Sequence, residues 1–402
     1  MRILITGGGG FLGSQLCSAL LTRGTLTGPS GATEPLTEIV LLDAAFHRPA
    51  PAHPTIRVTP LTGDISDRAT VFAAVGLGSS AATVGSIFHL ASMVSGECEL
   101  RFDDALRVNL DGGRNVFEAA RAITTASGSR PRVVFASSIA CYSGETVSPV
   151  NTDTTKLTPR TTYGMTKAIC ELLINDHSRK GHFDGRTARL PTVIIRPGQP
   201  NAAASSWASG MFREPLNGQP CALPVRRDQG HLMTGYRTVI ASLIALHEVP
   251  ESALADDRGY VLPAHTVTPA LAESALRQVA AERGLTLGPM VDAPDARIQG
   301  IVSIWPVAID ASRALALGLP SPPPLAALIA HYLEDFGGPS SRTSRAYPRP
   351  KSEKVNPRLK SSVKRPSLTF SSLASHADVS LHPHLEFLPH RRSRSSRSHD
   401  RR

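Results

Sequence analysis

The sequence lacks the features that mark membrane, disulfide-rich and zinc-binding proteins. It has no apolar run near the roughly 20 residues that a membrane-spanning helix needs. Its five cysteines are an odd number, widely spaced and without a Cys-x-x-Cys pair, which argues against a disulfide framework and a zinc site. A strand is expected to begin at Arg2, so we expect no signal peptide before it. These absences favour reduced thiols, no bound metal, no membrane partner and a cytoplasmic location.

An excess of positive charge is also missing from most of the chain, although the formal net charge is +10. From Gly338 onward there are 15 Lys and Arg against 4 Asp and Glu, whereas the first 337 residues hold 28 against 29. The folded part therefore gives no sign of binding nucleic acid. Segment 338–402 is dense in Ser, Arg, Pro and His without apolar periodicity, so we predict a disordered basic tail.

What the first half of the chain does contain is an alternation of short apolar runs with helix-like stretches. We expect strands at 2–6, 39–42, 56–60, 87–90, 133–135 and 193–195, and helices at 11–23, 66–75, 103–126 and 161–178. A Gly/Pro/Thr-rich loop is expected at 24–37. Strands that alternate with helices pair in parallel, with helices on both faces of the sheet. The pattern predicts an α/β fold with a doubly wound parallel sheet of the Rossmann type over residues 1–197.

The rhythm breaks after residue 197. Residues 198–230 are rich in Pro, Gly, Ala and Ser and predict long loops over a pocket. Residues 231–337 alternate expected helices (238–247, 269–282, 311–317 and 325–335) with short strands. We therefore expect 198–337 to form a smaller α/β substrate lid, interleaved with the Rossmann core.

A glycine-rich loop joins the first expected strand to the first expected helix. Gly7, Gly10 and Gly13 fit the spacing T-G-x-x-G-x-x-G, and Phe11 and Leu12 open the helix. Such glycines permit a tight turn, let the backbone approach a pyrophosphate and let the helix pack on the strand, while the helix N-terminus favours phosphate. The loop predicts a dinucleotide site.

Acidic residues follow the second and third expected strands. Asp43 is placed to accept hydrogen bonds from the adenosine ribose and to repel a 2′-phosphate, which favours NAD over NADP. Asp64 and Ile65 are placed to reach the adenine, although Asp64 fits an ordinary turn equally well.

A Tyr and a Lys four residues apart, Tyr163 and Lys167, fall on one face of an expected helix. A lysine ammonium favours the phenolate of a neighbouring tyrosine, which can then take a proton from an alcohol while hydride leaves to a nicotinamide. Ser138, just after the fifth expected strand, supplies a hydroxyl that can orient the reacting oxygen. A turn or helix-cap serine is the alternative interpretation of Ser138.

This order of motifs resembles the extended short-chain dehydrogenase/reductase family, which includes nucleotide-sugar epimerases and dehydratases. The resemblance covers roughly residues 1–335 and includes His89-Leu-Ala91, Asn109 and the Ser138/Tyr163/Lys167 set. It implies NAD as cofactor, and it implies a site lined by Leu90, Ala91, Asn109 and Pro191 for the cofactor and by Ser92 for the substrate. It also implies a possible homodimer through the helices at 103–126 and 161–178.

Residues 189–216 most resemble the D-erythronate dehydrogenases within this family, which implies oxidation of the 2-hydroxyl of a small sugar acid. An acid substrate needs a cation, and an arginine fork suits a carboxylate. Arg213 is the first candidate because it lies in this stretch; Arg226, Arg227 and Arg237 are the others. His231 and His89 are possible titrating groups, although His89 ends an expected buried strand and fits a core residue better.

Two other functions remain open. The first is a nucleotide-sugar 4-epimerase, which needs only the same triad and NAD. A dehydratase, by contrast, carries an acidic pair after the catalytic hydroxyl, where this sequence has Ile139 and Ala140, which argues against that chemistry. A non-enzymatic NAD-sensing regulator would keep the glycine loop but has no need for Ser138, Tyr163 and Lys167 together.

Overall fold

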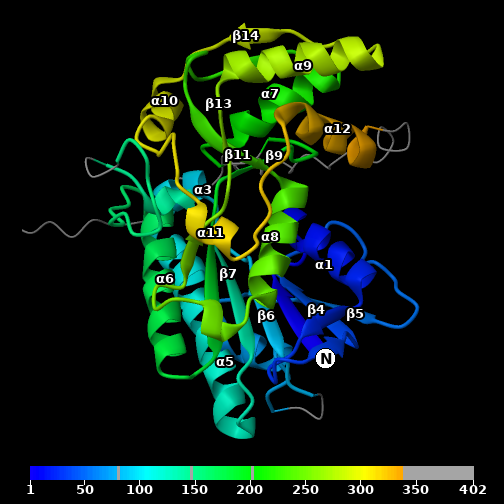
Figure 1. The fold of residues 1–402 in the computed structure, drawn as a ribbon, viewed down its shortest axis with the longest axis vertical. Helices are drawn as coiled ribbons and strands as arrows, with labels where there is room; N and C mark the ends of the chain where they lie inside the picture. Colours follow the sequence, from blue (N-terminus) through cyan, green and yellow to red (C-terminus); the bar gives the residue numbers. More distant parts are fainter. Residues whose placement is uncertain (79–81, 145–147, 201–202, 338–402) are drawn as a thin grey trace, which may run out of the picture. The chain divides into compact units, whose positions relative to one another are not determined.

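The computed structural model describes residues 1–78, 82–144, 148–200 and 203–337, so the expected tail 338–402 lies outside the described residues. Seven parallel strands form the central sheet: β1 (Arg2–Thr6), β4 (Glu38–Asp43), β5 (Arg57–Thr62), β6 (Ser86–His89), β7 (Arg132–Ser138), β8 (Asp184–Leu190) and β12 (Gly259–Val261). Their order in space is β12-β8-β7-β6-β1-β4-β5 (Figure 1). The direction of winding reverses between β1 and β6, which confirms the doubly wound Rossmann sheet.

Helices cover both faces of this sheet (Figure 1). One face packs against α1 (Phe11–Arg23) and α8 (Tyr236–Glu248), and the other against α2 (Arg68–Ala74), α5 (Gly112–Ser127) and α6 (Thr162–Arg179). Successive side chains of a strand point to opposite faces, so Ile3 and Ile5 enter the core with α1 and α8, while Leu4 enters the other core. Burial on both faces explains the apolar runs of β1, β4, β6 and β7.

The chain after residue 197 builds a second core and also returns to the first. The second core holds the helices α7 (Ser206–Leu216), α9 (Pro269–Arg283), α10 (Ala296–Val302) and α12 (Leu325–Phe336) with the strands β9 (Thr192–Ile194), β10 (Cys221–Leu223), β11 (His231–Gly235), β13 (His265–Val267) and β14 (Met290–Asp292). β9, β11 and β13 form a three-stranded sheet, and β10 pairs with β14. Because α8 packs on the main sheet and β12 is one of its strands, no single cut separates the two cores. α11 (Ser312–Ala316) packs against β12.

Several expected elements differ in the structure. Residues 198–230 contain α7 as well as loops, because Trp207, Met211 and Phe212 fall on one helical face and enter the second core. The expected loop 24–37 contains a hairpin of β2 (Thr25–Thr27) and β3 (Thr33–Pro35). β8 escaped prediction because its polar residues, among them Arg186, hide a strand that is buried throughout.

The expected helix 103–126 is interrupted. It is preceded by α3 (Ser95–Leu100), begins as α4 (Phe102–Ala105), passes through a π-helical segment η1 (Leu106–Asp111) and continues as α5. Two short 3₁₀ turns, η2 (Ile139–Cys141) and η3 (Glu251–Ala253), complete the elements of the described residues. A π-helical segment often occurs where a side chain serves a site, and here it carries Asn109.

All five cysteines are buried and unpaired, as their number and spacing predict. Within the described ranges, no helix has the length and apolar character to cross a membrane. The same residues contain no group of three or more His, Cys, Asp or Glu side chains that could hold a metal ion.

Candidate active site

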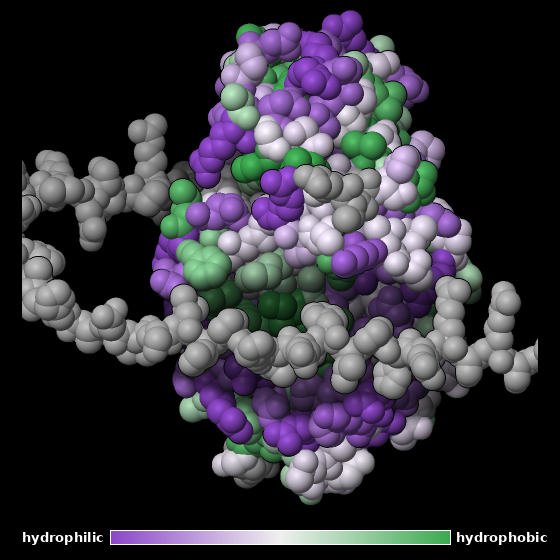
Figure 2. Space-filling view, turned by 90° about the vertical axis from the view of Figure 1, so that its left-hand side faces the viewer, coloured by the Kyte–Doolittle hydropathy of each residue, from purple (hydrophilic) through white to green (hydrophobic). Residues whose placement is uncertain are grey.

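A pocket of about 950 Å³ lies beyond the carboxyl ends of β1, β6 and β7, where the winding of the sheet reverses. Of the residues expected at the site, it is lined by Gly7, Gly10, Phe11, Leu12, Gly13, Asp43, Asp64, Ile65, Leu90, Ala91, Ser92, Ser138, Tyr163, Lys167 and Pro191. Seen from the side, the described part of the molecule is hollowed at mid-height, and hydrophobic residues are visible in the hollow (Figure 2). This volume is large enough for a dinucleotide and a small substrate.

The glycine loop at one end of the pocket leaves no space for side chains. Gly7 has a φ of +72°, and a Cβ there would lie 2.8 Å from the backbone nitrogen of Ala91. A Cβ on Gly13 would lie 2.1 Å from the carbonyl oxygen of Gly7. No side chain caps the N-terminus of α1, so its N–H groups remain available to phosphate. The loop therefore fits the pyrophosphate of a dinucleotide.

Asp43 and Asp64, the two acids expected at the cofactor site, differ in the contacts that their carboxylates make. Asp43 Oδ2 accepts a hydrogen bond from the backbone N–H of Gly9 at 2.9 Å, so the carboxylate lies against the loop. Asp64 accepts hydrogen bonds from the N–H and hydroxyl of Ser66 and pairs with Arg107, which together hold the pKa of its carboxyl below the usual range. The Asp64 carboxylate is therefore held by Ser66 and Arg107, whereas the Asp43 carboxylate lies against the glycine loop, where a dinucleotide would bind.

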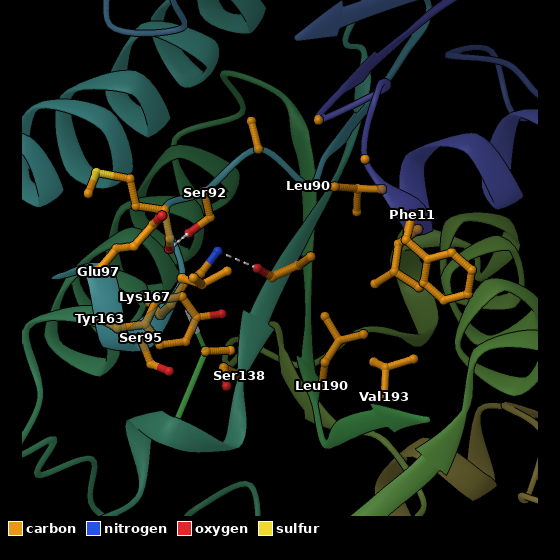
Figure 3. Close-up of a pocket in the computed structure, with 18 of the residues that line it drawn as sticks. Phe11, Leu90, Ser92, Ser95, Glu97, Ser138, Tyr163, Lys167, Leu190 and Val193 are labelled. Atoms are coloured by element: carbon orange, nitrogen blue, oxygen red, sulfur yellow. Dashed lines mark hydrogen bonds between the residues drawn. The ribbon is translucent and has the colours of Figure 1, made fainter. Parts of the chain in front are cut away.

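The expected catalytic residues meet at the other end of the pocket, where Figure 3 shows Ser138, Tyr163 and Lys167 close together and Phe11, Leu190 and Val193 across from them. Lys167 Nζ donates to the carbonyl of Ala136 at 2.8 Å and lies 5.5 Å from the centre of the Tyr163 ring. Ser138 accepts a hydrogen bond from the N–H of Ala140 at 3.1 Å. It therefore caps a turn and also lines the pocket, so both interpretations of this serine apply.

Burial tunes both titrating groups of this set toward their neutral forms. Desolvation raises the pKa of Tyr163 above its usual value, and a hydrogen bond with Ser138 acts in the opposite direction. Desolvation also lowers the pKa of Lys167 to about 8, close to neutral pH. A lysine that exchanges its proton near neutral pH beside a tyrosine is typical of acid–base chemistry.

Comparison with known proteins gives the family. The model of the NAD-dependent epimerase/dehydratase family matches residues 3–231. A D-erythronate dehydrogenase of Cupriavidus necator is 43% identical over 338 residues, which are 84% of this chain and 99% of the relative. The chain belongs to the NAD-dependent epimerase/dehydratase family. A D-erythronate dehydrogenase of Haemophilus influenzae is 35% identical over 326 residues, covering 79% of this chain and 94% of the relative.

A solved structure is also similar to the fold of this chain. The nucleoside-diphosphate-sugar epimerase from Agrobacterium tumefaciens has a TM-score of 0.75 and 36% identity, covering 83% of this chain and 94% of that one. NAD is the cofactor of the family, and the glycine loop and Asp43 fit it.

Asn109 and Arg213, which the sequence analysis assigned to the site, do not line the pocket. Asn109 is buried behind the wall, where its side chain bonds both the N–H (2.7 Å) and the carbonyl (3.3 Å) of Met93. Arg213 is buried as well: its guanidinium pairs with Glu214 and donates to the carbonyl of Arg196 at 3.0 Å. The structure does not bring Arg213 to Tyr163.

The other expected cations and histidines are also used elsewhere. Arg226 pairs with Asp228, Arg227 with Asp292 and Glu273, and Arg237 with Glu334 and Asp335. His89 is a core residue, as its position predicts: it bonds Thr6, and burial lowers its pKa to about 3. His231 bonds Thr192, and burial lowers its pKa to about 4, so it is neutral at physiological pH.

The sequence analysis missed the residues that close the far end of the pocket. They are Ser95, Glu97, Thr192, Val193, Arg196, Ser205, Ser206, Ser209 and Trp305. Arg196 lies in the same stretch, 189–216, as Arg213, which the sequence analysis chose as the first candidate for the cation. Nothing in the sequence marks Trp305, because only the second core brings it to the pocket.

Proposed function

We propose that the protein is an NAD-dependent dehydrogenase that oxidises the 2-hydroxyl of a small sugar acid of the D-erythronate type. The observation that carries the proposal is the joint placement of Ser138, Tyr163 and Lys167 in one pocket with a lining arginine, Arg196. The 43% identity to a D-erythronate dehydrogenase over nearly its whole length supports the same substrate class.

The chemistry follows from the residues present. Lys167 in its ammonium form stabilises the phenolate of Tyr163, which takes the proton of the 2-hydroxyl and becomes the neutral phenol. Ser138 accepts a hydrogen bond from the N–H of Ala140 and also hydrogen-bonds Tyr163, so its hydroxyl is placed to orient the substrate oxygen beside this tyrosine. NAD, when bound, supplies the hydride acceptor.

Arg196 is our candidate for the carboxylate anchor, in place of Arg213. Three arginines line the pocket, and they differ in position: Arg107 pairs with Asp64 near the cofactor end, Arg101 pairs with Asp104, and Arg196 follows β9. Arg196 lies on the lid side, with its N–H bonded to Ser209 at 3.1 Å.

α7 fixes the backbone of this anchor from both sides. Its Ser209 accepts the N–H of Arg196, and its Arg213 donates to the carbonyl of Arg196. Arg213 thereby acts on the substrate end through Arg196. The guanidinium of Arg196 itself donates from Nη2 to the carbonyl of Gln199 at 2.7 Å. A guanidinium group suits bidentate binding of a carboxylate.

The remaining hydroxyls of a sugar acid need hydrogen-bond partners. Ser95 and Glu97 of α3 line the pocket near Tyr163 (Figure 3). The carboxylate of Glu97 has no hydrogen-bond partner among residues 1–337 as far as the structure describes them, so it can accept from a polyol. Trp305 also lines the pocket, and its buried Nε1 lacks a partner in the described residues, so it can donate.

A nucleotide-sugar 4-epimerase is the second candidate, favoured by the likeness to the solved epimerase from Agrobacterium tumefaciens. The dehydratase alternative loses support because Ile139 and Ala140, both buried, stand at the pocket wall where an acidic pair is needed.

The test is a direct assay. The purified protein is given NAD with D-erythronate and its stereoisomers, and NADH absorbance is followed; a UDP-sugar is tested in parallel for epimerisation. We expect NADH with the four-carbon acid. If no four- or five-carbon sugar acid reduces NAD while a nucleotide sugar is epimerised, the second candidate replaces the first.

Quaternary structure belongs to the same proposal. We expect a homodimer that forms through α5, α6 and the short helices α3 and α4. Large apolar side chains are exposed on these elements: Leu100 on α3, Phe102 on α4 and Leu172 on α6. Light scattering measures the mass, and Leu172→Glu should shift it to the monomer.

A further inference from the structure

A third polar residue continues the catalytic row of α6. Tyr163, Lys167 and Glu171 are spaced four residues apart, so they follow one another along one face of the helix. Glu171 is buried, and its Oε2 accepts from Nε and Nη2 of Arg189 at 2.9 and 2.8 Å. Its other oxygen, Oε1, accepts from the hydroxyl of Ser137.

The segment that carries Ser138 is fastened at both ends by this ion pair. At one end Ser137 donates to Glu171. At the other end Arg189 Nη1 donates to the hydroxyl of Tyr142 at 2.6 Å. Ser138 stands between these two contacts, on the turn from β7 into η2.

Glu171 also differs in charge from the other titratable groups around Lys167. Those other groups are His89 on β6, Cys98 on α3, Cys141 on η2, and Tyr163 and Cys170 on α6. Burial raises the pKa of the Cys98 and Cys170 thiols to about 11 and 12, raises that of Cys141 further, and lowers that of His89 to about 3. These groups are neutral at pH 7, and so is Tyr163, whereas Glu171 is the carboxylate of an ion pair.

We propose that Glu171 is a positioning residue of the active site: together with Arg189 it holds the turn that carries Ser138, and its negative charge keeps Lys167 in the ammonium form. The inference deepens the proposed function, since it concerns the groups that move the proton there. It holds for any substrate that the triad oxidises.

A buried ion pair is weak support for stability alone, because desolvation offsets much of the attraction between its charges. The chain contains a matched pair for comparison. Asp184 is also buried and lies at the amino end of β8, away from the pocket, where it pairs with Arg186 of the same strand and with Arg132 and Arg258. A purely structural role would make the two pairs equivalent in their effect on the site.

The test compares Glu171→Gln with Asp184→Asn. Glu171→Gln removes the nearer of the two carboxylates beside Arg189, and Asp184→Asn removes the carboxylate that Arg186 shares with Arg132 and Arg258, so both should lower the melting temperature. The seven lysines of the chain permit ¹⁵N NMR titration of their side-chain amines, with Lys167 assigned by its absence in Lys167→Met. In Glu171→Gln the ammonium loses a favourable charge, so the pKa of Lys167 should fall below about 8, by on the order of one unit. Asp184→Asn should leave it unchanged.

The pH profile of kcat/KM gives the second measurement, with whichever substrate the protein turns over. Activity that needs the Lys167 ammonium is lost as pH rises through the pKa of this lysine. The descending limb should therefore move to lower pH in Glu171→Gln and stay in place in Asp184→Asn. An unchanged Lys167 titration, or an equal shift in both variants, overturns the electrostatic part of the proposal.

Ser137→Ala tests the positioning part even if Glu171→Gln does not fold. It removes the contact to Glu171 but keeps the charge, so kcat should fall roughly tenfold, as expected for loss of one hydrogen bond to a charged group, while the Lys167 titration stays in place. Wild-type kcat in Ser137→Ala overturns this part. Failure of the wild type to oxidise sugar acids would refute the proposed function alone, since the NMR titration needs no substrate.

Discussion

The cofactor end of the pocket is built from backbone, whereas the substrate end is built from side chains. At the cofactor end, Gly7 and Gly13 clear space for a phosphate, and the helix N-terminus offers N–H groups. At the substrate end, Ser138, Tyr163 and Arg196 reach the pocket from three different elements. Backbone recognition is common to every substrate of such a fold, so the identity of the substrate depends on the second end.

The two ends should therefore respond differently to substitution. Changes at the substrate end should abolish or redirect turnover while NAD still binds. Changes at the cofactor end should alter the choice of dinucleotide and leave the choice of substrate in place.

Tyr163→Phe should give the largest effect. The variant keeps the ring and its packing but loses the proton acceptor, so kcat should fall by about 10³-fold or more. NAD binding, measured by calorimetry, should stay within a few fold of wild type. Near-full activity would remove Tyr163 from the mechanism and weaken the contrast between the ends.

Arg196→Ala should come next. Loss of a charged anchor for the carboxylate should lower kcat/KM for the sugar acid by roughly a hundredfold, mostly through KM. Arg226→Ala is the matched control, because Arg226 is an exposed lid arginine paired with Asp228 and does not line the pocket. Equal kinetics in the two variants would place the carboxylate elsewhere.

The sequence predicted pocket-lining residues best where they follow one another in local order. Gly7, Gly10 and Gly13 follow a strand at fixed spacing, and Tyr163 and Lys167 share a helical turn, so one-dimensional patterns locate them. The parallel sheet was predictable for the same reason, since its buried strands are apolar runs.

The substrate end was predicted less well because tertiary packing assembles it. Arg213 and Arg196 lie in the same quoted stretch, and only the fold decides which one lines the pocket and which one pairs with Glu214. Glu171 and Arg189 belong to α6 and β8, and their pairing depends on how that helix packs on that strand. Polar residues in a buried strand also concealed β8 itself.

Asp43→Ser should give a smaller effect, at the cofactor end. The change removes the carboxylate that lies against Gly9 and would repel a 2′-phosphate. The ratio of kcat/KM for NAD to that for NADP should fall by about tenfold or more. The KM for the sugar acid at saturating cofactor should stay the same. A wild-type protein that prefers NADP would contradict the assignment of Asp43 to the ribose.

The smallest expected effect concerns two buried histidines, one beneath each end of the pocket. His89 bonds Thr6 under the cofactor end, and His231 bonds Thr192 under the substrate end. Burial lowers the pKa of His89 to about 3 and that of His231 to about 4, whereas unfolded histidine titrates near 6.5. Below pH 6.5 the unfolded state therefore binds protons that the folded state does not, and stability falls as pH decreases from about 6.5 toward 4.

His231→Asn removes one of these groups, so the loss of melting temperature between pH 7 and pH 5 should shrink by a few degrees relative to wild type. Calorimetry at the two pH values measures the difference, and His47→Asn, at an exposed position, serves as the control. An unchanged pH dependence in His231→Asn would mean that other groups govern the acid sensitivity of the substrate end.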